Sequence, residues 1–389
     1  MKVLFILHST GKASGGHYHS LNHISRVVGR ELTAGVITVG SAQSPVLADN
    51  PYFIRHVVLQ KTGDLPGFFS QLRELYASFE PDVLHFFDTE SLNFLLLIPA
   101  TTRYPLVMSK CGGPNPMRKK WQQVDDLILF SGENYEWFRH NHHYKKTRIH
   151  LIPNRVSKLG LLPESKRAER KDDGVINFVR VSRLGGAYEK TLMDSFNLIE
   201  KLSVKYKVHF YVIGRIQDEA RFQVLRKYAE DKELPVEFIT DERASKGADF
   251  LYLADFVVGT GRSLIEALSL GIPCLTPAAN CSMPVLVTRQ NFDGLFATNF
   301  SERNRGDDET LATNLDNIER LIEEKEAYQE ARKTSLTFFE NYFDVERVTG
   351  KYVSIYNISL NKAQGLKLVF RNFPYVVKSL LGLALGKNS

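Results

Sequence analysis

The sequence contains a glycine turn and a polar helix start of the kind that binds phosphate. A strand-like run at 255–258 precedes this segment, which consists of Gly259, Thr260, Gly261, Arg262, Ser263 and Leu264. Glycines let the backbone turn tightly near a ligand, and the N–H groups of a first helical turn attract anions. Glu266 lies one turn inside the helix, where its carboxylate would accept hydrogen bonds from ribose hydroxyls. A plain strand–turn–helix with a capping serine fits the same residues.

A pair of cations follows the strand-like run at 176–181. Arg183 comes just after the strand, and Lys190 lies seven residues further on. Two cations in this position can neutralise the charge that develops on a diphosphate leaving group. A surface arginine and a lysine at the start of a helix are the alternative interpretation.

A third glycine segment, with Gly15 and Gly16, follows the first strand-like run at 2–8 and fits either a ligand loop or a simple turn.

Two segments have metal-ligand residue types. The histidines at 139–143 lack a carboxylate or cysteine at useful spacing, so we interpret them as a solvated helix end. Asp88 and Glu90 are typical of a helix N-cap and its first turn. No metal site is predicted.

These residues must be positioned by an alternation of strands and helices that runs twice along the chain. The first series predicts strands at 2–8, 34–39, 54–59, 82–87, 106–109, 127–131 and 149–153, with helices at 19–32 and 65–78. The second predicts strands at 176–181, 208–213, 236–239, 255–258 and 272–276, with helices at 191–201, 219–231 and 264–270. Further helices are predicted near 311–324, 325–339 and 345–356. This alternation indicates two doubly wound α/β domains with parallel sheets, whose ligands lie where strands end and helices begin.

Composition supports this organisation. A chain of 389 residues fits two domains: 1–155, a charged linker at 156–174, and 175–340, followed by a C-terminal helix and tail at 341–389. With 43% hydrophobic residues the chain has enough apolar side chains for a core, and no run approaches the roughly 20 apolar residues of a membrane span. Three cysteines predict neither a disulfide framework nor a zinc knuckle, and favour a reducing cytoplasm.

The positive charge is concentrated at one end. Seven Lys and Arg residues and no acidic residue lie from Arg347 onward, so the net charge of +6 leaves −1 for the residues before it. A nearly neutral body argues against a nucleic-acid-binding protein with a basic groove.

Taken together and in order, these segments resemble glycosyltransferases of the GT-B fold, in particular glycosyltransferase family 4. The resemblance covers most of the chain. It rests on Pro81–His85, Phe130–Ser131, Ile149–Val156, Val181–Leu184 with Lys190, Tyr211–Gly214 and, most specifically, Glu266–Pro273.

The resemblance implies two Rossmann-like domains that face a cleft, and transfer of a sugar with retention and without a metal or other cofactor. Arg183 and Lys190 would hold the donor's diphosphate and Glu266 its ribose. Other donor contacts would come from Gly15, Gly16, Gly214 and the segment Gly259–Leu264, while the N-terminal domain would bind the acceptor.

Two positions depart from the family pattern. A second glutamate, expected eight residues before Glu266, is replaced by Val258. The family's mid-domain histidine near Ser109 is also replaced, and Lys110 and Asn115 would partly substitute for it. Together with His85, these two residues are expected on the acceptor side.

The tail at 365–387 interleaves apolar and basic residues, and Pro374 is expected to divide it into two short pieces. Such a segment suits the surface of an anionic membrane, and packing on the N-terminal domain is the alternative. We therefore expect a cytoplasmic or peripheral membrane enzyme that transfers a sugar from a nucleotide diphosphate to a glycan or lipid-linked saccharide of the bacterial surface. The expected nucleotide is UDP. The alternatives are a non-catalytic GT-B subunit that supports a partner enzyme and, more weakly, a sugar-nucleotide epimerase.

Overall fold

The computed structural model describes residues 1–389 except 11–14, 117–120, 161–173, 362–364 and 387–389. It divides the chain into two compact units. Unit 1 comprises residues 1–155 and 345–389, and unit 2 comprises residues 156–344. Most of the predicted linker lies outside the described residues.

Unit 1 contains a seven-stranded parallel sheet in the order β3-β2-β1-β4-β5-β6-β7. Its strands are β1 Lys2–Ser9, β2 Thr33–Gly40, β3 Phe53–Val58, β4 Val83–Phe86, β5 Leu106–Lys110, β6 Asp126–Leu129 and β7 Arg148–Leu151. Strands β1 and β4 are almost wholly buried, which explains why they appear in the sequence as continuous apolar runs.

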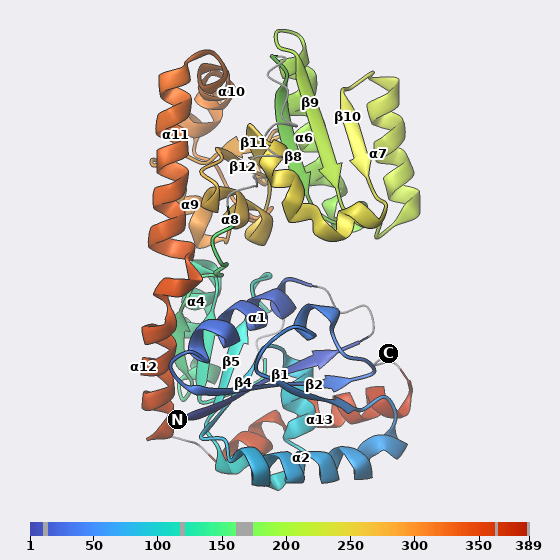
Figure 1. The fold of residues 1–389 in the computed structure, drawn as a ribbon, viewed down its shortest axis with the longest axis vertical. Coiled ribbons are helices and arrows are strands. Elements are labelled where there is room, and N and C mark those ends of the chain that lie inside the picture. The colour runs from blue at the N-terminus through green and yellow to red at the C-terminus, as the bar shows by residue number, and fades with distance from the viewer. Residues whose placement is uncertain (11–14, 117–120, 161–173, 362–364, 387–389) are drawn as a thin grey trace. The chain divides into compact units, whose positions relative to one another are not determined.

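Helices cover both faces of this sheet. They are α1 Gly16–Val28, α2 Leu65–Phe79, α3 Thr89–Leu95, α4 Gly132–His140, α12 Thr349–Leu360 and α13 Lys367–Ala384. One apolar core joins the sheet to α2, α3, α4 and α13, and a second joins it to α1 and α12. Figure 1 shows α2 and α13 on one side of the sheet and α1 on the other. The C-terminal helices therefore complete the unit that the N-terminus begins.

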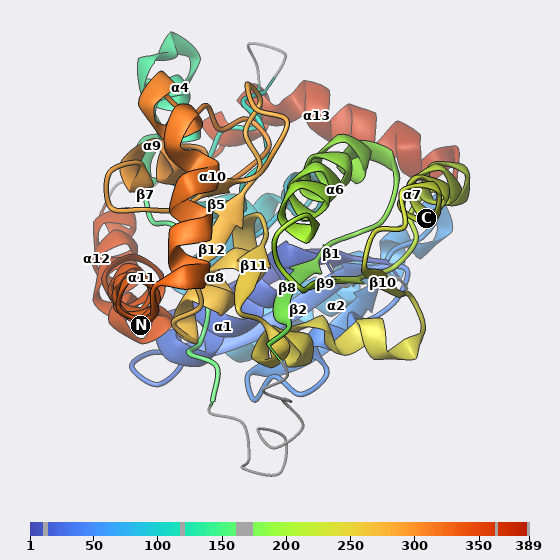
Figure 2. The same cartoon turned by 90° about the horizontal axis from the view of Figure 1, so that it is seen from above.

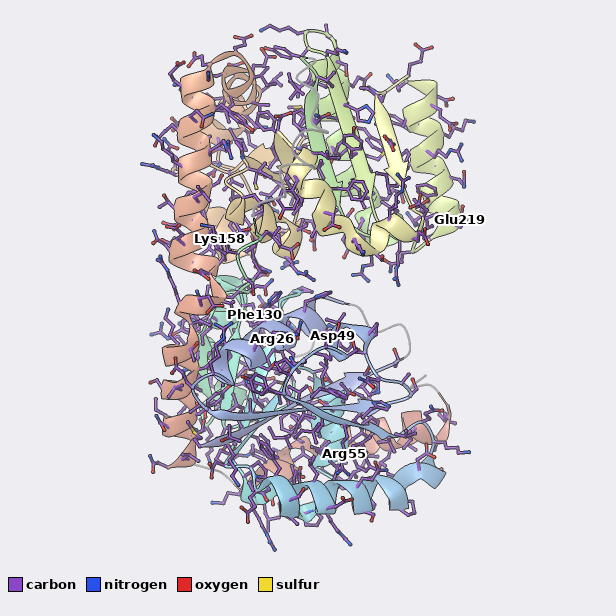
Figure 3. The ribbon with its side chains drawn as sticks, in the orientation of Figure 1. Arg26, Asp49, Arg55, Phe130, Lys158 and Glu219 are labelled. Atoms are coloured by element: carbon purple, nitrogen blue, oxygen red, sulfur yellow. The ribbon has the colours of Figure 1, made fainter. Side chains whose placement is uncertain are left out.

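Polar contacts fasten these helices to the loops around the sheet. Arg26 of α1 donates from Nη2 to the Asp49 carbonyl at 2.5 Å, and both residues are labelled in Figure 3. Asp88 caps α3 by accepting from the Ser91 N–H at 2.7 Å, which confirms the predicted N-cap.

Unit 2 contains a six-stranded sheet in the order β10-β9-β8-β11-β12-β13, in which only β13 is antiparallel to its neighbour. The strands are β8 Ile176–Val181, β9 Val208–Ile213, β10 Val236–Ile239, β11 Phe256–Val258, β12 Cys274–Thr276 and β13 Val285–Leu286. The helices are α6 Glu189–Ser203, α7 Glu219–Asp231, α8 Gly261–Ser269, α9 Phe292–Ala297, α10 Asp308–Glu323 and α11 Lys325–Phe338, with a 3-10 segment at Glu242–Leu253.

The helices of unit 2 also form two layers. Helices α6, α7 and α10 pack on one face of the sheet, and α8, α9 and α11 on the other. Figure 2 shows α6 and α7 beside strands β8 to β10. The two doubly wound sheets predicted from the alternation of strands and helices are confirmed.

One expectation about the tail is wrong. Helix α13 runs without a break through Pro374. The proline removes one backbone hydrogen bond, but Leu368 on one side of it and Val376 and Leu383 on the other are buried in the core of unit 1. This packing holds the helix together across the proline. Among the described residues, no helix combines the length and the apolar character needed to cross a membrane.

Candidate functional site

In unit 2 the strand order reverses between β8 and β11. The predicted phosphate-binding residues lie just after the ends of these two strands. The two strands are parallel neighbours, with Phe178 paired to Phe256. From β8 the chain continues to α6, on one face of the sheet, and from β11 to α8, on the other. Ligands of doubly wound sheets bind where the carboxyl ends of two such strands diverge. Arg183 and the segment 259–264 follow these two ends directly.

The start of α8 presents backbone N–H groups that no side chain caps. Thr260 is the N-cap residue and makes no side-chain capping bond. Gly261 has φ of +53°, a conformation that favours glycine. At Gly259 a Cβ atom would lie 3.2 Å from the Leu264 nitrogen, so this glycine keeps the turn close to the helix. An uncapped first turn can bind an anion.

Glu266 is buried on α8 and bound to a cation of the same helix. Arg262 donates to its Oε1 atom from Nε at 2.7 Å and from Nη2 at 2.6 Å. Burial raises the pKa of the Glu266 carboxyl, and the Arg262 guanidinium acts in the opposite direction. Arg262 therefore contributes a side chain as well as the predicted backbone group, and it favours the charged form of Glu266.

Arg183 is held by an aromatic residue from its own loop. Its Nη2 donates to the Tyr188 hydroxyl at 2.7 Å, and its guanidinium carbon lies 5.1 Å from the centre of the Tyr188 ring. Lys190 bonds the buried Asp194 one turn along α6 at 2.7 Å. Tyr188 was not predicted, although its position between the two cations in one short loop was a usable signal.

A buried arginine positions this loop from beneath. Arg180 of β8 donates from Nη1 to the Thr191 carbonyl at 2.6 Å and to the Ser195 hydroxyl at 2.8 Å. Burial lowers the pKa of its guanidinium to about 10. These bonds join β8 to α6 on either side of the 183–190 loop. An arginine inside an apolar strand is the sequence signal that indicates such a residue.

Gly214 lies at the end of β9, beside the segment that leads to Arg183. A Cβ atom on this residue would lie 1.6 Å from the Ser182 carbonyl oxygen, so a side chain cannot fit unless the backbone moves. The Gly214 N–H donates to the Ile239 carbonyl at 3.0 Å. The role of Gly214 is thus to let β9 approach the end of β8.

Gly214→Ala is expected to lower the free energy of unfolding by about 3 kcal/mol, the upper end of the range for overpacking, because backbone must move to admit the methyl group. Urea unfolding of the full chain measures this change. Gly16→Ala is the matched control, since no atom lies within 4 Å of a Cβ atom at Gly16. Equal midpoints for the two variants would contradict the assignment.

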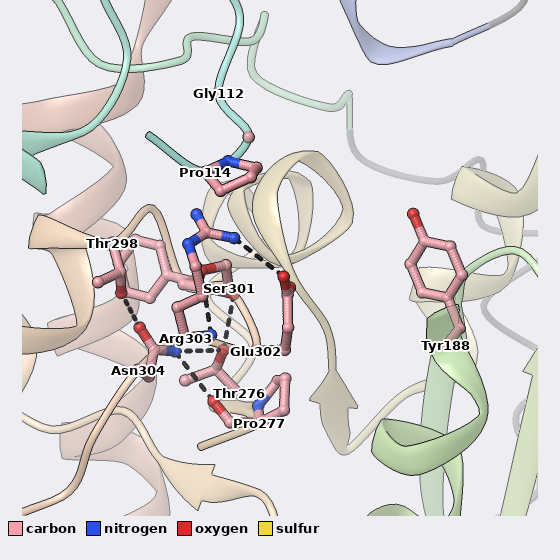
Figure 4. A network of polar contacts seen from close by, with 12 residues as sticks. Gly112, Pro114, Tyr188, Thr276, Pro277, Thr298, Ser301, Glu302, Arg303 and Asn304 are labelled. Carbon is pink, nitrogen blue, oxygen red and sulfur yellow. Dashed lines mark hydrogen bonds and ion pairs between the residues drawn. The ribbon is translucent and has the colours of Figure 1, made fainter. Parts of the chain in front are cut away.

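A buried network holds the loop after β12, the strand next to β11. Asn304 donates from Nδ2 to the Pro277 carbonyl at 3.0 Å and to the Thr276 hydroxyl at 3.2 Å, and it accepts a bond from Thr298 (Figure 4). Asn304 lies 28 residues from Thr276 in sequence. No local pattern could have indicated this contact.

Unit 1 has its own switch point, between β1 and β4. Gly15 is the N-cap residue of α1, and Gly16 begins the helix. Asp88, after β4, accepts from the His8 N–H at 2.6 Å, and the Tyr18 hydroxyl donates to the His8 carbonyl at 2.9 Å. Burial, and then the nearby Asp88, raise the pKa of Tyr18 to about 12. The two glycines thus lie beside a polar cluster of His8, Tyr18 and Asp88.

Two of the three residues predicted for the acceptor side meet in one loop. The Lys110 ammonium donates to the Gly112 carbonyl at 2.6 Å and to Asn134 Oδ1 at 2.8 Å, and Asn134 Nδ2 donates to Asn115 Oδ1 at 2.8 Å. Lys110 therefore fixes the loop that contains Asn115.

The third, His85, is placed in the core of unit 1. Its Nδ1 lies 2.8 Å from the Tyr356 hydroxyl and its Nε2 lies 2.9 Å from the Ser109 hydroxyl. The side chain is fully buried, and burial lowers its pKa to about 3. In this structure both ring nitrogens are used within the core, so His85 joins β4 to β5 and α12.

Among the residues that the structure describes, no group of three or more histidine, cysteine, aspartate or glutamate side chains could hold a metal ion. The histidines at 139–143 lie at a helix end, as predicted: α4 ends at His140, whose Nδ1 lies 2.8 Å from the Glu136 carbonyl.

No protein-family model matches the sequence, and no curated protein matches it closely enough to report. Solved structures do resemble the fold. A glycosyltransferase from Rickettsia africae superposes with a TM-score of 0.68 at 13% identity, over 92% of this chain and 98% of its own. HepE from Anabaena, solved with UDP and glucose, gives 0.66 at 17% identity, over 92% and 100%. A UDP-GlcNAc 2-epimerase from Neisseria meningitidis, bound to UDP-GlcNAc, gives 0.58 at 15% identity, over 92% and 100%.

These likenesses extend over both units and nearly the whole length of each structure. Together with the two doubly wound sheets, they show that this chain has the GT-B fold, built from two Rossmann-like α/β units.

Proposed function

We propose that this protein is a glycosyltransferase that moves a sugar from a nucleotide diphosphate to a hydroxyl group. The observation that carries the proposal is the switch point of unit 2, where Arg183, the uncapped start of α8 and the buried Glu266 come together on neighbouring strand ends. Cations and backbone N–H groups suit a diphosphate, and a buried carboxylate suits ribose hydroxyls.

In the proposed reaction, the bond between the sugar's anomeric carbon and the phosphate oxygen breaks, and a bond to the acceptor oxygen forms. The nucleotide diphosphate leaves with the electron pair, and the acceptor hydroxyl gives its proton to the departing phosphate oxygen. Arg183, Lys190 and the N–H groups at Arg262–Leu264 stabilise the charge that develops on the leaving diphosphate. The two Arg262 bonds both go to Oε1 of Glu266, which leaves its second oxygen for the ribose.

The nucleotide, the stereochemistry of transfer and the acceptor are proposed from similarity to other proteins. UDP is proposed as the nucleotide because HepE was solved with UDP and with UDP-glucose. Retention of configuration, and a glycan or lipid-linked saccharide of the bacterial surface as acceptor, follow from the family resemblance. Gly15, Gly16 and the loop fixed by Lys110 are proposed to contribute from unit 1, and the enzyme to act at the cytoplasmic face of the membrane.

A non-catalytic role is the second candidate, and Val258 favours it. This residue is fully buried and apolar at the end of β11, where the family resemblance implies a glutamate near the transferred sugar. A binding subunit would retain the nucleotide site and lack turnover.

The first test is the melting temperature of the purified chain with UDP, GDP, ADP, CMP and their sugar conjugates. A ligand at about 100 times its dissociation constant stabilises the native state by about 2.7 kcal/mol. We expect UDP to raise the melting temperature, and Glu266→Ala to remove most of the increase. Glu219→Ala, on an exposed face of α7, is the control and should show the same increase in melting temperature as the wild type. No increase with any diphosphate would refute the proposed site.

Product analysis then separates the functions. A transferase releases UDP and forms a glycoside only when acceptor is present, whereas an epimerase converts UDP-sugar without acceptor. Binding of UDP with no product from any donor would favour the non-catalytic subunit.

A further inference from the structure

The outward side of α13 presents a row of large apolar side chains to solvent. The row consists of Leu366, Phe370, Phe373, Leu381 and Leu385, and is here called the α13 face. Steps of three, four and eight residues place these side chains on one side of a helix. Phe370 is 78% exposed and Leu385 is 66% exposed. A contiguous exposed apolar surface of this kind marks an interaction site.

The opposite side of α13 fixes the helix so that this row cannot turn inward. Leu368, Val376 and Leu383 are buried in the core of unit 1. Asn372 accepts from the Gln123 N–H at 2.8 Å and donates to the Gln123 carbonyl at 2.8 Å. Because both apolar and polar contacts hold this orientation, the α13 face stays exposed.

Cations accompany the α13 face. Lys367 and Lys378 are exposed on the same border of the helix, and Arg371, on this border as well, is half-buried near Gln123. The residues from Arg347 onward contain no aspartate or glutamate. Helix α13 is thus amphipathic on its solvent side, with an apolar row beside a line of positive charge.

We propose that the α13 face docks on an anionic lipid bilayer, with α13 lying in the plane of the interface. Aromatic and leucine side chains enter the boundary between headgroups and acyl chains, while the lysines contact anionic headgroups. A second copy of the chain fits less well. Symmetric pairing of two α13 faces would bring the cations of both copies together without acidic partners on either helix. Anionic lipid supplies the missing opposite charge.

The test is co-sedimentation of the full chain with vesicles of phosphatidylglycerol and phosphatidylcholine, compared with phosphatidylcholine alone. We expect binding to the anionic vesicles only, weakened by salt. Lys367→Ala with Lys378→Ala should reduce the partition coefficient about 30-fold, since each cation near an anionic surface is worth about a factor of five. Phe370→Ser with Leu381→Ser should reduce it by about 10-fold or more.

Val204→Ser is the matched control, because Val204 is an exposed apolar residue of unit 2. It should bind as the wild type does, and all variants should keep the wild-type melting temperature. Failure of the wild-type chain to sediment with anionic vesicles would overturn the proposal. So would sedimentation velocity that shows a dimer abolished by Phe370→Ser, which would assign the α13 face to a second copy. Neither donor nor acceptor is needed, so the result is independent of the proposed sugar transfer.

Discussion

Arg183→Ala is expected to lower kcat for sugar transfer by about 100- to 1,000-fold, the loss typical of removing one group that stabilises developing charge. Arg183 is exposed just after β8, and its guanidinium bonds the Tyr188 hydroxyl of the same loop. Its removal should therefore leave the melting temperature unchanged. Steady-state kinetics with a UDP-sugar measure the effect, and KM for the donor should change much less than kcat.

Three companion variants make this result specific. Arg183→Lys keeps the charge but loses the planar fork, so it should recover part of the rate. Tyr188→Phe removes the hydroxyl that accepts the Arg183 bond and should cause a smaller loss than Arg183→Ala. Arg226→Ala removes an exposed cation on α7 and should have no effect. If Arg183→Ala turned over as fast as Arg226→Ala, the role given to Arg183 would be wrong.

Acidification is expected to destabilise unit 1 because His85 is buried in its neutral form. Burial lowers the pKa of His85 from 6.5 to about 3, so between these values the unfolded chain binds a proton that the native state does not. The contribution is complete above pH 6.5 and is lost as the pH falls toward 3. At roughly 1.4 kcal/mol per pH unit, the loss is about 2 kcal/mol at pH 5 and about 5 kcal/mol at pH 3.

His85→Gln isolates this contribution. Glutamine does not titrate, so the variant should be less stable at pH 7 and lose less stability between pH 7 and pH 5 than the wild type. His140→Gln, at an exposed histidine of the same unit, should follow the wild-type curve. Urea unfolding at several pH values gives the comparison. Parallel curves for His85→Gln and the wild type would contradict the assignment.

The sequence predicted three neighbouring strands of unit 2 well, because each is a short apolar run between clear turn signals. Strands β8, β9 and β10 and helix α7 have the predicted bounds. It did not predict β13, whose two residues are too short to show a period, or α9, whose six residues span less than two turns. Pro374 wrongly indicated a break in α13, since the packing that keeps the helix intact comes from residues far away in sequence.

Local patterns indicated where ligand-binding residues lie, because strand ends and glycine turns are local features. They did not indicate side-chain partners. The bond between Arg262 and Glu266 is an exception, because residues four apart on a helix face one another. Whether His85 bonds Tyr356, 271 residues away, depends on the folded packing. The assignment of His85 to the acceptor side came from the family resemblance of Pro81–His85, whereas its burial depends on α12 covering it.

Unit 2 is inserted into unit 1, and this affects the order of events on the ribosome. Residues 156–344 emerge as one continuous stretch, whereas unit 1 must wait for residues 345–389 before α12 and α13 can cover its sheet. Domains fold as units while the chain is synthesised at about 5–20 residues per second. Unit 2 can therefore finish folding first, and the parts of the unit 1 sheet that α12 and α13 cover stay exposed until these two helices have been synthesised.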